Sequence, residues 1–274
     1  MTPPRDGPAK PPRDRSPGYK FRPRPPQRPG PTPREGHDHV VLYGWHPVSQ
    51  ALANAGRRFH RLLATENALL RLKETLPDLP VEPEIVRPSA IDRLLGPDAV
   101  HQGLYAEADP LDAPDLEAMP DDALLLALDQ ITDPHNVGAI VRTAAAFGVT
   151  AIVTTARHSP NATGVLAKSA SGGLEHVPLV IVRNLAEALI TLSERGFTRI
   201  GLDSDAETPL DAVGPQRPAV LVLGAEGKGL RQRTRECCDV LVRIDAVGAI
   251  RSLNVSNAAA ISLYALTRPG AGMP

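Results

Sequence analysis

The sequence predicts an α/β protein with a mainly parallel sheet, preceded by a smaller α/β domain. Three observations lead to this prediction. Short apolar runs typical of strands alternate with segments of helical periodicity along most of the 274 residues. An acidic stretch with three prolines, residues 107–122, interrupts this alternation. Residues 1–36 contain only four apolar side chains, too few to form a core.

The N-terminal segment differs from the rest of the chain in charge. Residues 1–36 carry nine Lys or Arg against three Asp or Glu, and 12 of the 29 prolines. Because the whole chain has a net charge of -1, a basic segment precedes an acidic body. We expect residues 1–38 to be a disordered arm. Its Arg and Pro tracts suit contact with a polyanion such as nucleic acid, and a solubilising tail is the alternative.

A small α/β domain is predicted over residues 39–107. The predicted strands are residues 39–43, 58–65, 82–86 and 103–106. A loop at 44–47 precedes the first of the predicted helices, which are residues 48–55, 67–75 and 89–95, the last capped by Ser89. Residues 107–122 contain seven acidic and no basic residues, so we place an interdomain linker at 108–122.

The larger domain is predicted over residues 123–274. Its expected strands are residues 123–128, 151–154, 177–182, 199–202, 219–223 and 240–244. These runs are apolar on both faces and alternate with helical segments. That pattern is typical of a parallel sheet covered by helices on both sides.

Several classes of protein are disfavoured by composition. The longest apolar run, residues 123–128, is far shorter than the roughly 20 residues of a membrane helix. No export signal follows the first methionine. Cys237 and Cys238 are the only cysteines, and because they are adjacent they suit neither a disulfide nor a zinc site. We therefore expect a cytoplasmic protein without a metal.

The first segment with candidate chemistry, residues 129–148, follows a predicted strand and leads into a helix. Asn136 is a candidate cap for this helix. Its apolar stripe would contain Val137, Ile140, Val141 and Ala144. Arg142 projects away from that stripe and could bind a phosphate, position a hydroxyl or pair with a carboxylate, and spacing alone favours the ion pair. His135 is either a base or, as the preferred interpretation, a solvated loop histidine.

Two further segments follow apolar strands. Residues 219–230 place Gly224, Gly227 and Gly229 directly after a strand, which indicates either close approach to a ligand or a tight turn. The spacing matches neither a P-loop nor GxGxxG, and this argues against a dinucleotide oxidoreductase. Residues 244–260 pass from a loop into a helix of small residues that Ser252 or Asn254 would cap.

Together, residues 133–144, 223–229 and 252–256 resemble, in order and spacing, the three motifs of the SpoU (TrmH) family of RNA ribose 2'-O-methyltransferases. Residues 44–48 and 101–103 resemble the L30e-like RNA-binding domain of the rRNA-modifying branch. One departure is that Asp245 and Ala246 stand where the family usually has proline and often methionine. We expect Asp245 to place an extra carboxylate near the cofactor.

The resemblance implies a SPOUT domain with a C-terminal trefoil knot and a site for S-adenosylmethionine. The cofactor pocket would be lined by Leu223, Gly224, Glu226, Gly227, Ile244, Ser252 and Leu253. The reacting centre would be formed by Asn136, Arg142, Glu226, Ser252 and Asn254. Among these, Arg142 would orient the ribose and stabilise the developing alkoxide.

The resemblance also implies a substrate and partners. RNA would meet Gly44, Trp45 and His46 of the L30e-like loop. Arg57, Arg58 and Arg61 are candidates on a separate ground, because RNA needs local positive charge on an acidic body, and a solvated face is their alternative interpretation. A guanosine of 23S rRNA is the favoured target; a tRNA ribose methyltransferase and a non-catalytic ribosome-assembly factor are the alternatives. We expect a homodimer through the helix at 254–266, with its contact face formed by Val255, Ala259, Ser262 and Leu266.

Overall fold

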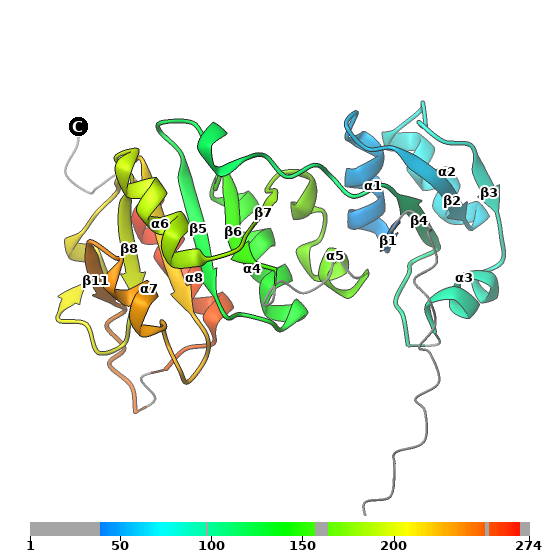
Figure 1. Ribbon diagram of the computed structural model, residues 1–274. Coiled ribbons are helices and arrows are strands. Elements are labelled where there is room, and N and C mark those ends of the chain that lie inside the picture. Colours follow the sequence, from blue (N-terminus) through cyan, green and yellow to red (C-terminus); the bar gives the residue numbers. More distant parts are fainter. Residues whose placement is uncertain (1–38, 97, 157–163, 250–251, 269–274) are drawn as a thin grey trace, which may run out of the picture. The chain divides into compact units, whose positions relative to one another are not determined.

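A computed structural model describes residues 39–96, 98–156, 164–249 and 252–268 (Figure 1). The arm expected at residues 1–38 lies outside this description. The described strands form two sheets, one within residues 40–108 and the other within residues 124–243. None of the described helices is long and apolar enough to cross a membrane.

The first sheet has four strands in the order β1-β4-β2-β3. The strands are β1 (Val40–Tyr43), β2 (Phe59–Ala64), β3 (Pro83–Ile85) and β4 (Leu104–Ala108). The helices of this part are α1 (Trp45–Ala53), α2 (Glu66–Thr75) and α3 (Pro88–Leu95). β4 pairs antiparallel with both β1 and β2, whereas β2 and β3 are parallel. The core beneath includes Leu42, Leu62, Leu72 and Leu104.

Two helices of this part begin differently from the sequence-based expectation. α1 starts at Trp45, so residues 45–47 belong to its first turn rather than to a loop. Pro47 is tolerated there because N–H groups of the first turn have no intrahelical partner. α3 starts at Pro88, and the hydroxyl of Ser89 is therefore not its cap. A proline at the first helical position replaces the predicted side-chain cap.

The second sheet has seven strands in the order β7-β6-β5-β10-β8-β11-β9. They are β5 (Leu124–Asp129), β6 (Ala151–Thr155), β7 (Leu179–Val182), β8 (Thr198–Leu202), β9 (Thr208–Pro209), β10 (Ala219–Gly224) and β11 (Val240–Arg243). All six neighbouring pairs are parallel, which confirms the predicted sheet class. Only the two-residue edge strand β9 was not predicted.

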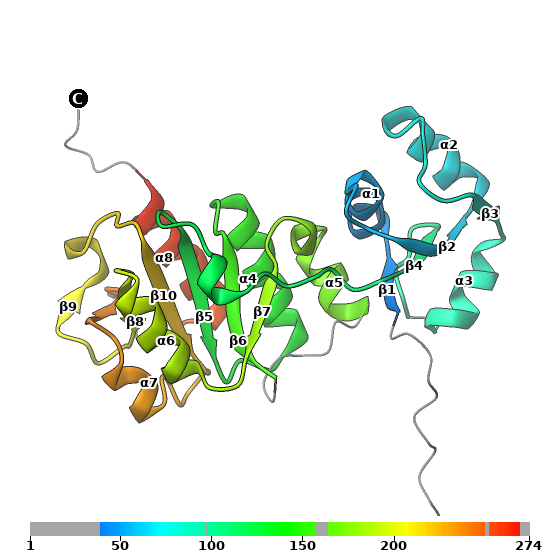
Figure 2. The same cartoon turned by 45° about the horizontal axis from the view of Figure 1, so that its top comes forward.

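Helices cover both faces of this sheet (Figure 2). One face packs against α4 (Pro134–Ala146), α5 (Gly164–Ala170) and α8 (Val255–Thr267). The other packs against α6 (Leu185–Glu194) and the segment around α7 (Gln232–Glu236). Leu126 of β5 points into the first layer and Leu125 into the second. Burial on both faces explains why the strands are continuous apolar runs.

The helix α8 corrects one expectation about assembly. The face predicted to meet a second subunit is buried in the chain's own core, since Val255, Ala259, Ser262 and Leu266 are at most 6% exposed. The opposite face carries Ile261 and Tyr264, which are 42% and 55% exposed. Both faces of this helix are apolar or small, so periodicity alone selected the wrong one.

Candidate active site

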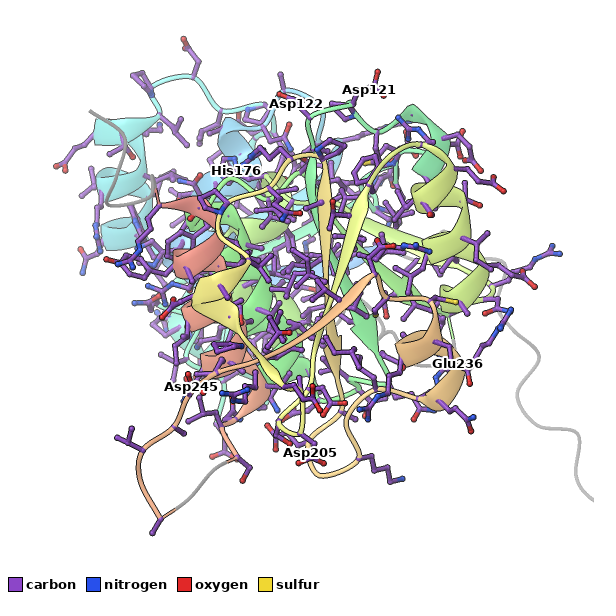
Figure 3. The ribbon with its side chains drawn as sticks, turned by 90° about the vertical axis from the view of Figure 1, so that its left-hand side faces the viewer. Asp121, Asp122, His176, Asp205, Glu236 and Asp245 are labelled. Carbon is purple, nitrogen blue, oxygen red and sulfur yellow. The ribbon has the colours of Figure 1, made fainter. Side chains whose placement is uncertain are left out.

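The three motif segments follow strands of one parallel sheet. Residues 133–144 come after β5, residues 225–229 after β10, and residues 252–256 after β11. Carboxyl ends of parallel strands meet at the same edge of the sheet, where α/β proteins usually bind ligands. Asp205 and Asp245, from the loops after β8 and β11, lie at this same end (Figure 3). The fold therefore gathers segments that are up to 120 residues apart in the sequence.

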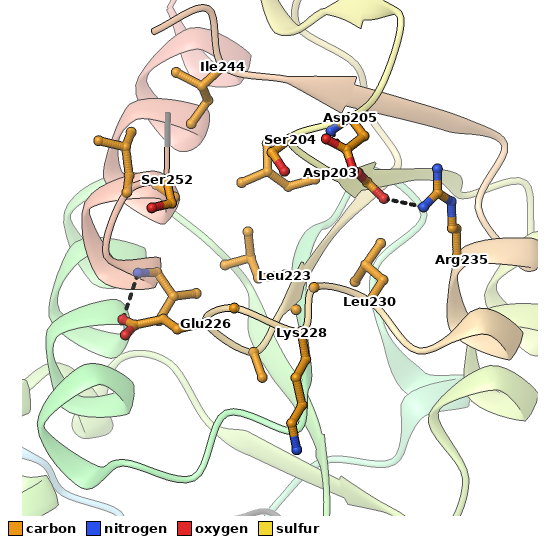
Figure 4. A pocket seen from close by; sticks show the side chains of 18 residues that line it. Asp203, Ser204, Asp205, Leu223, Glu226, Lys228, Leu230, Arg235, Ile244 and Ser252 are labelled. Atoms are coloured by element: carbon orange, nitrogen blue, oxygen red, sulfur yellow. Dashed lines mark hydrogen bonds and ion pairs between the residues drawn. The ribbon is translucent and has the colours of Figure 1, made fainter. Parts of the chain in front are cut away.

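A cavity of about 380 Å³ opens at this edge (Figure 4). All the residues expected to hold the cofactor line it, namely Leu223, Gly224, Glu226, Gly227, Ile244, Ser252 and Leu253. Its volume falls in the range of roughly 300–1,000 Å³ that is typical of small-molecule sites. The cavity thus joins the second and third motifs into one wall.

The glycine-rich segment after β10 forms a tight turn that is also part of the cavity wall. The N–H of Gly229 donates to the carbonyl of Ala225 at 2.8 Å. Gly227 and Gly229 have φ angles of 74° and 65°, a region that side chains disfavour. A Cβ on Gly224 would lie 2.2 Å from the carbonyl carbon of Gly229. Both interpretations of these glycines, tight turn and ligand wall, are therefore compatible.

A buried carboxylate fastens this loop to the sheet. Asp129, at the end of β5, is fully buried and accepts from the backbone N–H of Arg231 at 2.9 Å. Its other oxygen accepts from Nε of Arg231 at 2.6 Å. The two bonds tie the end of the glycine loop to the strand that precedes the first motif. Sequence reasoning assigned no role to Asp129, although an acidic residue ending an apolar strand was a usable signal.

Glu226 joins all three motifs through one oxygen. Its Oε1 accepts from Nδ2 of Asn254 at 2.8 Å, from the backbone N–H of Val255 at 3.1 Å and from Nδ2 of Asn136 at 3.3 Å. Oδ1 of Asn136 in turn accepts from Nδ2 of Asn254 at 3.0 Å. We call Asn136, Glu226 and Asn254 the amide–carboxylate network. A carboxylate at the N-terminus of α8 is also favoured by the helix dipole.

Of the two asparagines predicted to cap helices, Asn254 does so and Asn136 does not. Asn254 does cap α8, because its Oδ1 accepts from the N–H of Ser256 at 2.9 Å. Asn136 does not cap α4, because Asp133 occupies that position and accepts from the N–H of His135. Asn136 lies inside the first turn instead, which leaves its amide free to join Glu226 and Asn254.

Arg142 lies on the exposed side of α4, and the predicted stripe of that helix is buried. Among the carboxylates that the structure describes, none pairs with Arg142. The ion pair, which spacing alone favoured for this side chain, is thus not found among the described residues. His135 is exposed, and its Nδ1 lies 3.4 Å from the hydroxyl of Ser169.

The far wall of the cavity carries polar residues that sequence reasoning missed. Asp203, which follows β8, pairs with Arg235 at 2.8 Å, and Ser204 and Asp205 also line the cavity. Figure 4 shows the Lys228 side chain extending away from this space. Asp203, Ser204 and Asp205 belong to none of the three motifs, and only their place after a strand of the sheet marks them as candidates.

The expectation for Asp245 is corrected. Asp245 is not among the residues that line the cavity. Its carboxylate instead accepts from Nε of Arg243 at 2.8 Å, and Arg243 also donates to the carbonyls of Ala206 and Glu207. The charge that replaces the family's usual proline is therefore paired within the loop.

The six residues expected to meet RNA differ in accessibility. His46 is exposed, and the side chain of Arg58 is 82% exposed. Gly44 is buried as the residue before α1, with a φ of 91°. The ring of Trp45 is stacked with the guanidinium of Arg71, 3.8 Å from its centroid. Arg61 pairs with Glu84 at 2.8 Å.

Arg57 is a correction to the RNA-contact set. Its guanidinium and the carboxylate of Glu175 are each only 3% exposed and form an ion pair at 2.8 Å. Arg57 also donates to the backbone carbonyl of Asp109, and Asn54 donates to the same Glu175 carboxylate. A side chain held in this way serves packing and is not free to contact a phosphate.

With this geometry established, comparison with known proteins decides the family. The description "SpoU rRNA Methylase family" matches residues 123–264. The chain belongs to this family. A second description, "RNA 2'-O ribose methyltransferase substrate binding", matches residues 41–114. Residues 115–122, the second half of the acidic segment, separate the two matches.

Named relatives and a solved structure extend this assignment. The chain is 37% identical to the 23S rRNA (guanosine-2'-O-)-methyltransferase RlmB of Pseudomonas putida, covering 83% of this chain and 95% of that protein. Identity to RlmB of Escherichia coli K12 is 36%, covering 83% and 98%. The SpoU methyltransferase AviRb of Streptomyces viridochromogenes in complex with AdoMet is 26% identical, with a TM-score of 0.70 over 82% of this chain and 88% of that one.

Proposed function

We propose that this protein transfers a methyl group from S-adenosylmethionine to the ribose 2'-hydroxyl of a guanosine in 23S rRNA. The observation that carries the proposal is the amide–carboxylate network, which joins the three SpoU motifs through Glu226, a residue of the cavity wall. The names of the RlmB relatives support the choice of a 23S rRNA guanosine.

The cavity suits S-adenosylmethionine in size and charge. Its lining includes the carboxylates of Asp203, Asp205 and Glu226, while Arg235 is paired with Asp203. The remaining negative charge suits a cationic sulfonium compound. Backbone groups of the turn at residues 224–229 would contact the adenosine, because Gly224, Gly227 and Gly229 carry no side chain to hold a ligand away from them.

The cofactor, when bound, supplies an electrophilic methyl group on its sulfonium. The protein must then position a hydroxyl and manage its proton. Arg142 is exposed without a described carboxylate partner, so its guanidinium can donate to the ribose oxygen and stabilise the negative charge that develops there. Because arginine stays protonated, Arg142 is not the base, and a substrate phosphate is the proton acceptor we favour. Asn136 and Asn254 would hold the ribose beside it.

RNA binding is assigned to the part matched by the substrate-binding description. His46 and Arg58 are the accessible members of the predicted set and would contact RNA directly. Trp45 would act together with the stacked Arg71. Residues 39–107 and 123–274 would act as separate domains joined by the linker at 108–122, and the basic arm at 1–38 would add phosphate contacts.

We also propose a homodimer, now through the exposed face of α8. Ile261 and Tyr264 present apolar surface there, and the Tyr264 ring meets Phe147, the residue after α4, edge-on with centroids 6.4 Å apart. An exposed apolar face of this kind suits a second copy of the chain. Light scattering of the wild type and of the Ile261→Glu variant tests this point. We expect the wild type to have the mass of a dimer and the variant that of a monomer. Equal masses for the two proteins would contradict the proposed interface. A cytoplasmic location and the trefoil knot stay predictions.

The activity is tested with purified protein, methyl-tritiated S-adenosylmethionine and protein-free transcripts of 23S rRNA and tRNA. We expect the label at one guanosine of the 23S transcript. The phosphodiester that follows this guanosine should resist cleavage by alkali, because its 2'-hydroxyl is methylated. Label in tRNA alone would instead support the tRNA alternative. Full cofactor binding without transfer to either RNA would support a non-catalytic factor.

A further inference from the structure

A second cluster of polar side chains lies at the edge of the four-stranded sheet. His39 immediately precedes β1, His60 belongs to β2, and Asp109 immediately follows β4. The strand order places β4 between β1 and β2, so side chains from both neighbours can converge on Asp109. The register agrees, since Ala108 pairs with both Val40 and Phe59.

A bulge in β2 aims His60 at this point. The pairing of β2 with β4 shifts register between Phe59 and Arg61, which makes His60 the extra residue. Bulges re-aim one side chain and often occur at functional sites. Nε2 of His60 lies 2.5 Å from Oδ1 of Asp109, and Nδ1 of His39 lies 3.5 Å from the same oxygen. The two histidine rings are 3.9 Å apart, centroid to centroid, and tilted by 38°.

These three atoms have the chemistry and spacing of a metal-ligand set. They all lie within 4.8 Å of one another, the only such group of three found among the described residues. Two imidazole nitrogens and one carboxylate oxygen are ligands that Zn²⁺, Ni²⁺ and Co²⁺ share. The side chains are 30–35% exposed, so water can reach the site and fill further coordination positions. Arg58 approaches Asp109 at the other oxygen, Oδ2, 3.9 Å away, and leaves Oδ1 to the histidines.

We propose that His39, His60 and Asp109 bind a divalent first-row transition-metal ion. Binding requires small outward movements of the two rings and of His60 from Asp109, because Nε2 of His60 lies only 2.5 Å from Oδ1 of Asp109. Such an ion ties the start of β1, the bulge of β2 and the end of β4 together. It stabilises the four-stranded sheet and takes no part in methyl transfer. Composition gave no sign of it, because the ligands lie 21 and 49 residues apart.

The test uses the full chain without an affinity tag, stripped with EDTA and dialysed. Zn²⁺ and Ni²⁺ are titrated separately by calorimetry, and Co²⁺ by visible absorption. The variants His60→Gln and Asp109→Asn keep the size of each side chain. His176→Gln is the matched control, because His176 is exposed and its ring lies 3.0 Å from Oε1 of Gln50, outside the cluster.

We expect one ion per chain in the wild type and the control, with affinity at least tenfold weaker in both cluster variants. The metal should raise the melting temperature of the wild type and the control only, and the Co²⁺ band should weaken in His60→Gln. Wild-type protein that takes up none of these ions at millimolar concentration would overturn the proposal. So would cluster variants that bind as tightly as the control. Circular dichroism of each metal-free variant separates loss of ligands from loss of fold.

Discussion

Replacement of Asp129 by asparagine tests how the cavity wall is held. The carboxylate is fully buried and bonds both the backbone N–H and Nε of Arg231. Asparagine keeps one oxygen for the backbone bond but loses the charge-assisted bond, worth about 1.5–3 kcal/mol. Its buried amide also lacks an acceptor, which costs about 1–3 kcal/mol more. The total expected loss is about 2.5–6 kcal/mol.

Part of this loss should appear as weaker cofactor binding, although Asp129 does not line the cavity. If about half of it falls on the conformation of residues 225–231, affinity for S-adenosylhomocysteine drops roughly ten- to hundredfold, since 1.4 kcal/mol corresponds to a factor of ten. Calorimetry measures the affinity, and denaturant unfolding measures the stability. Arg233→Ala is the control, because that side chain is 70% exposed and should change both quantities little. An Asp129→Asn protein that binds within twofold of the wild type would refute the reasoning.

Three further predictions follow from individual side chains. Arg142→Ala should abolish transfer in a turnover assay while leaving cofactor affinity within about twofold, because Arg142 does not line the cavity; an active variant would remove Arg142 from the reaction. Arg57→Ala should lower the free energy of unfolding by about 3–5 kcal/mol, because it leaves Glu175 buried without its partner. Arg58→Ala, at an exposed position, should change the free energy of unfolding by less than about 0.5 kcal/mol. Equal effects of the two substitutions would contradict the buried ion pair. Burial raises the pKa of the Cys238 thiol to about 12 from 9.0. At pH 8 its alkylation by iodoacetamide should therefore be roughly a thousandfold slower than that of an ordinary thiol. Rapid labelling of Cys238 in the folded protein, measured by mass spectrometry, would contradict this prediction.

The sequence predicted the strands well because burial on both faces of a parallel sheet leaves an unmistakable apolar run. The cap of α4 was mispredicted because two candidates compete within four residues. Asp133 followed by Pro134 is the stronger signal, since proline favours the first helical position. Once Asp133 is the cap, Asn136 becomes available to the amide–carboxylate network.

Contacts between residues far apart in the sequence are the part of the structure that the sequence could not predict. Arg57 and Arg58 are adjacent and chemically equal, yet one is buried against Glu175, 118 residues away, and the other is exposed. Local patterns cannot distinguish them. The far wall of the cavity presents the same difficulty, because Asp203 acquires its setting only when β8 lies beside β11. The motifs therefore located the site, and the fold supplied its supporting contacts.

The most direct test of the proposed function is a map of 2'-O-methylation across rRNA and tRNA from cells with and without this protein. We predict that one guanosine of 23S rRNA loses its methyl group in the deletion strain. Wild-type protein should restore it, and Arg142→Ala expressed at the same level should not. Unchanged 23S rRNA, or a loss confined to tRNA, would contradict the proposed function.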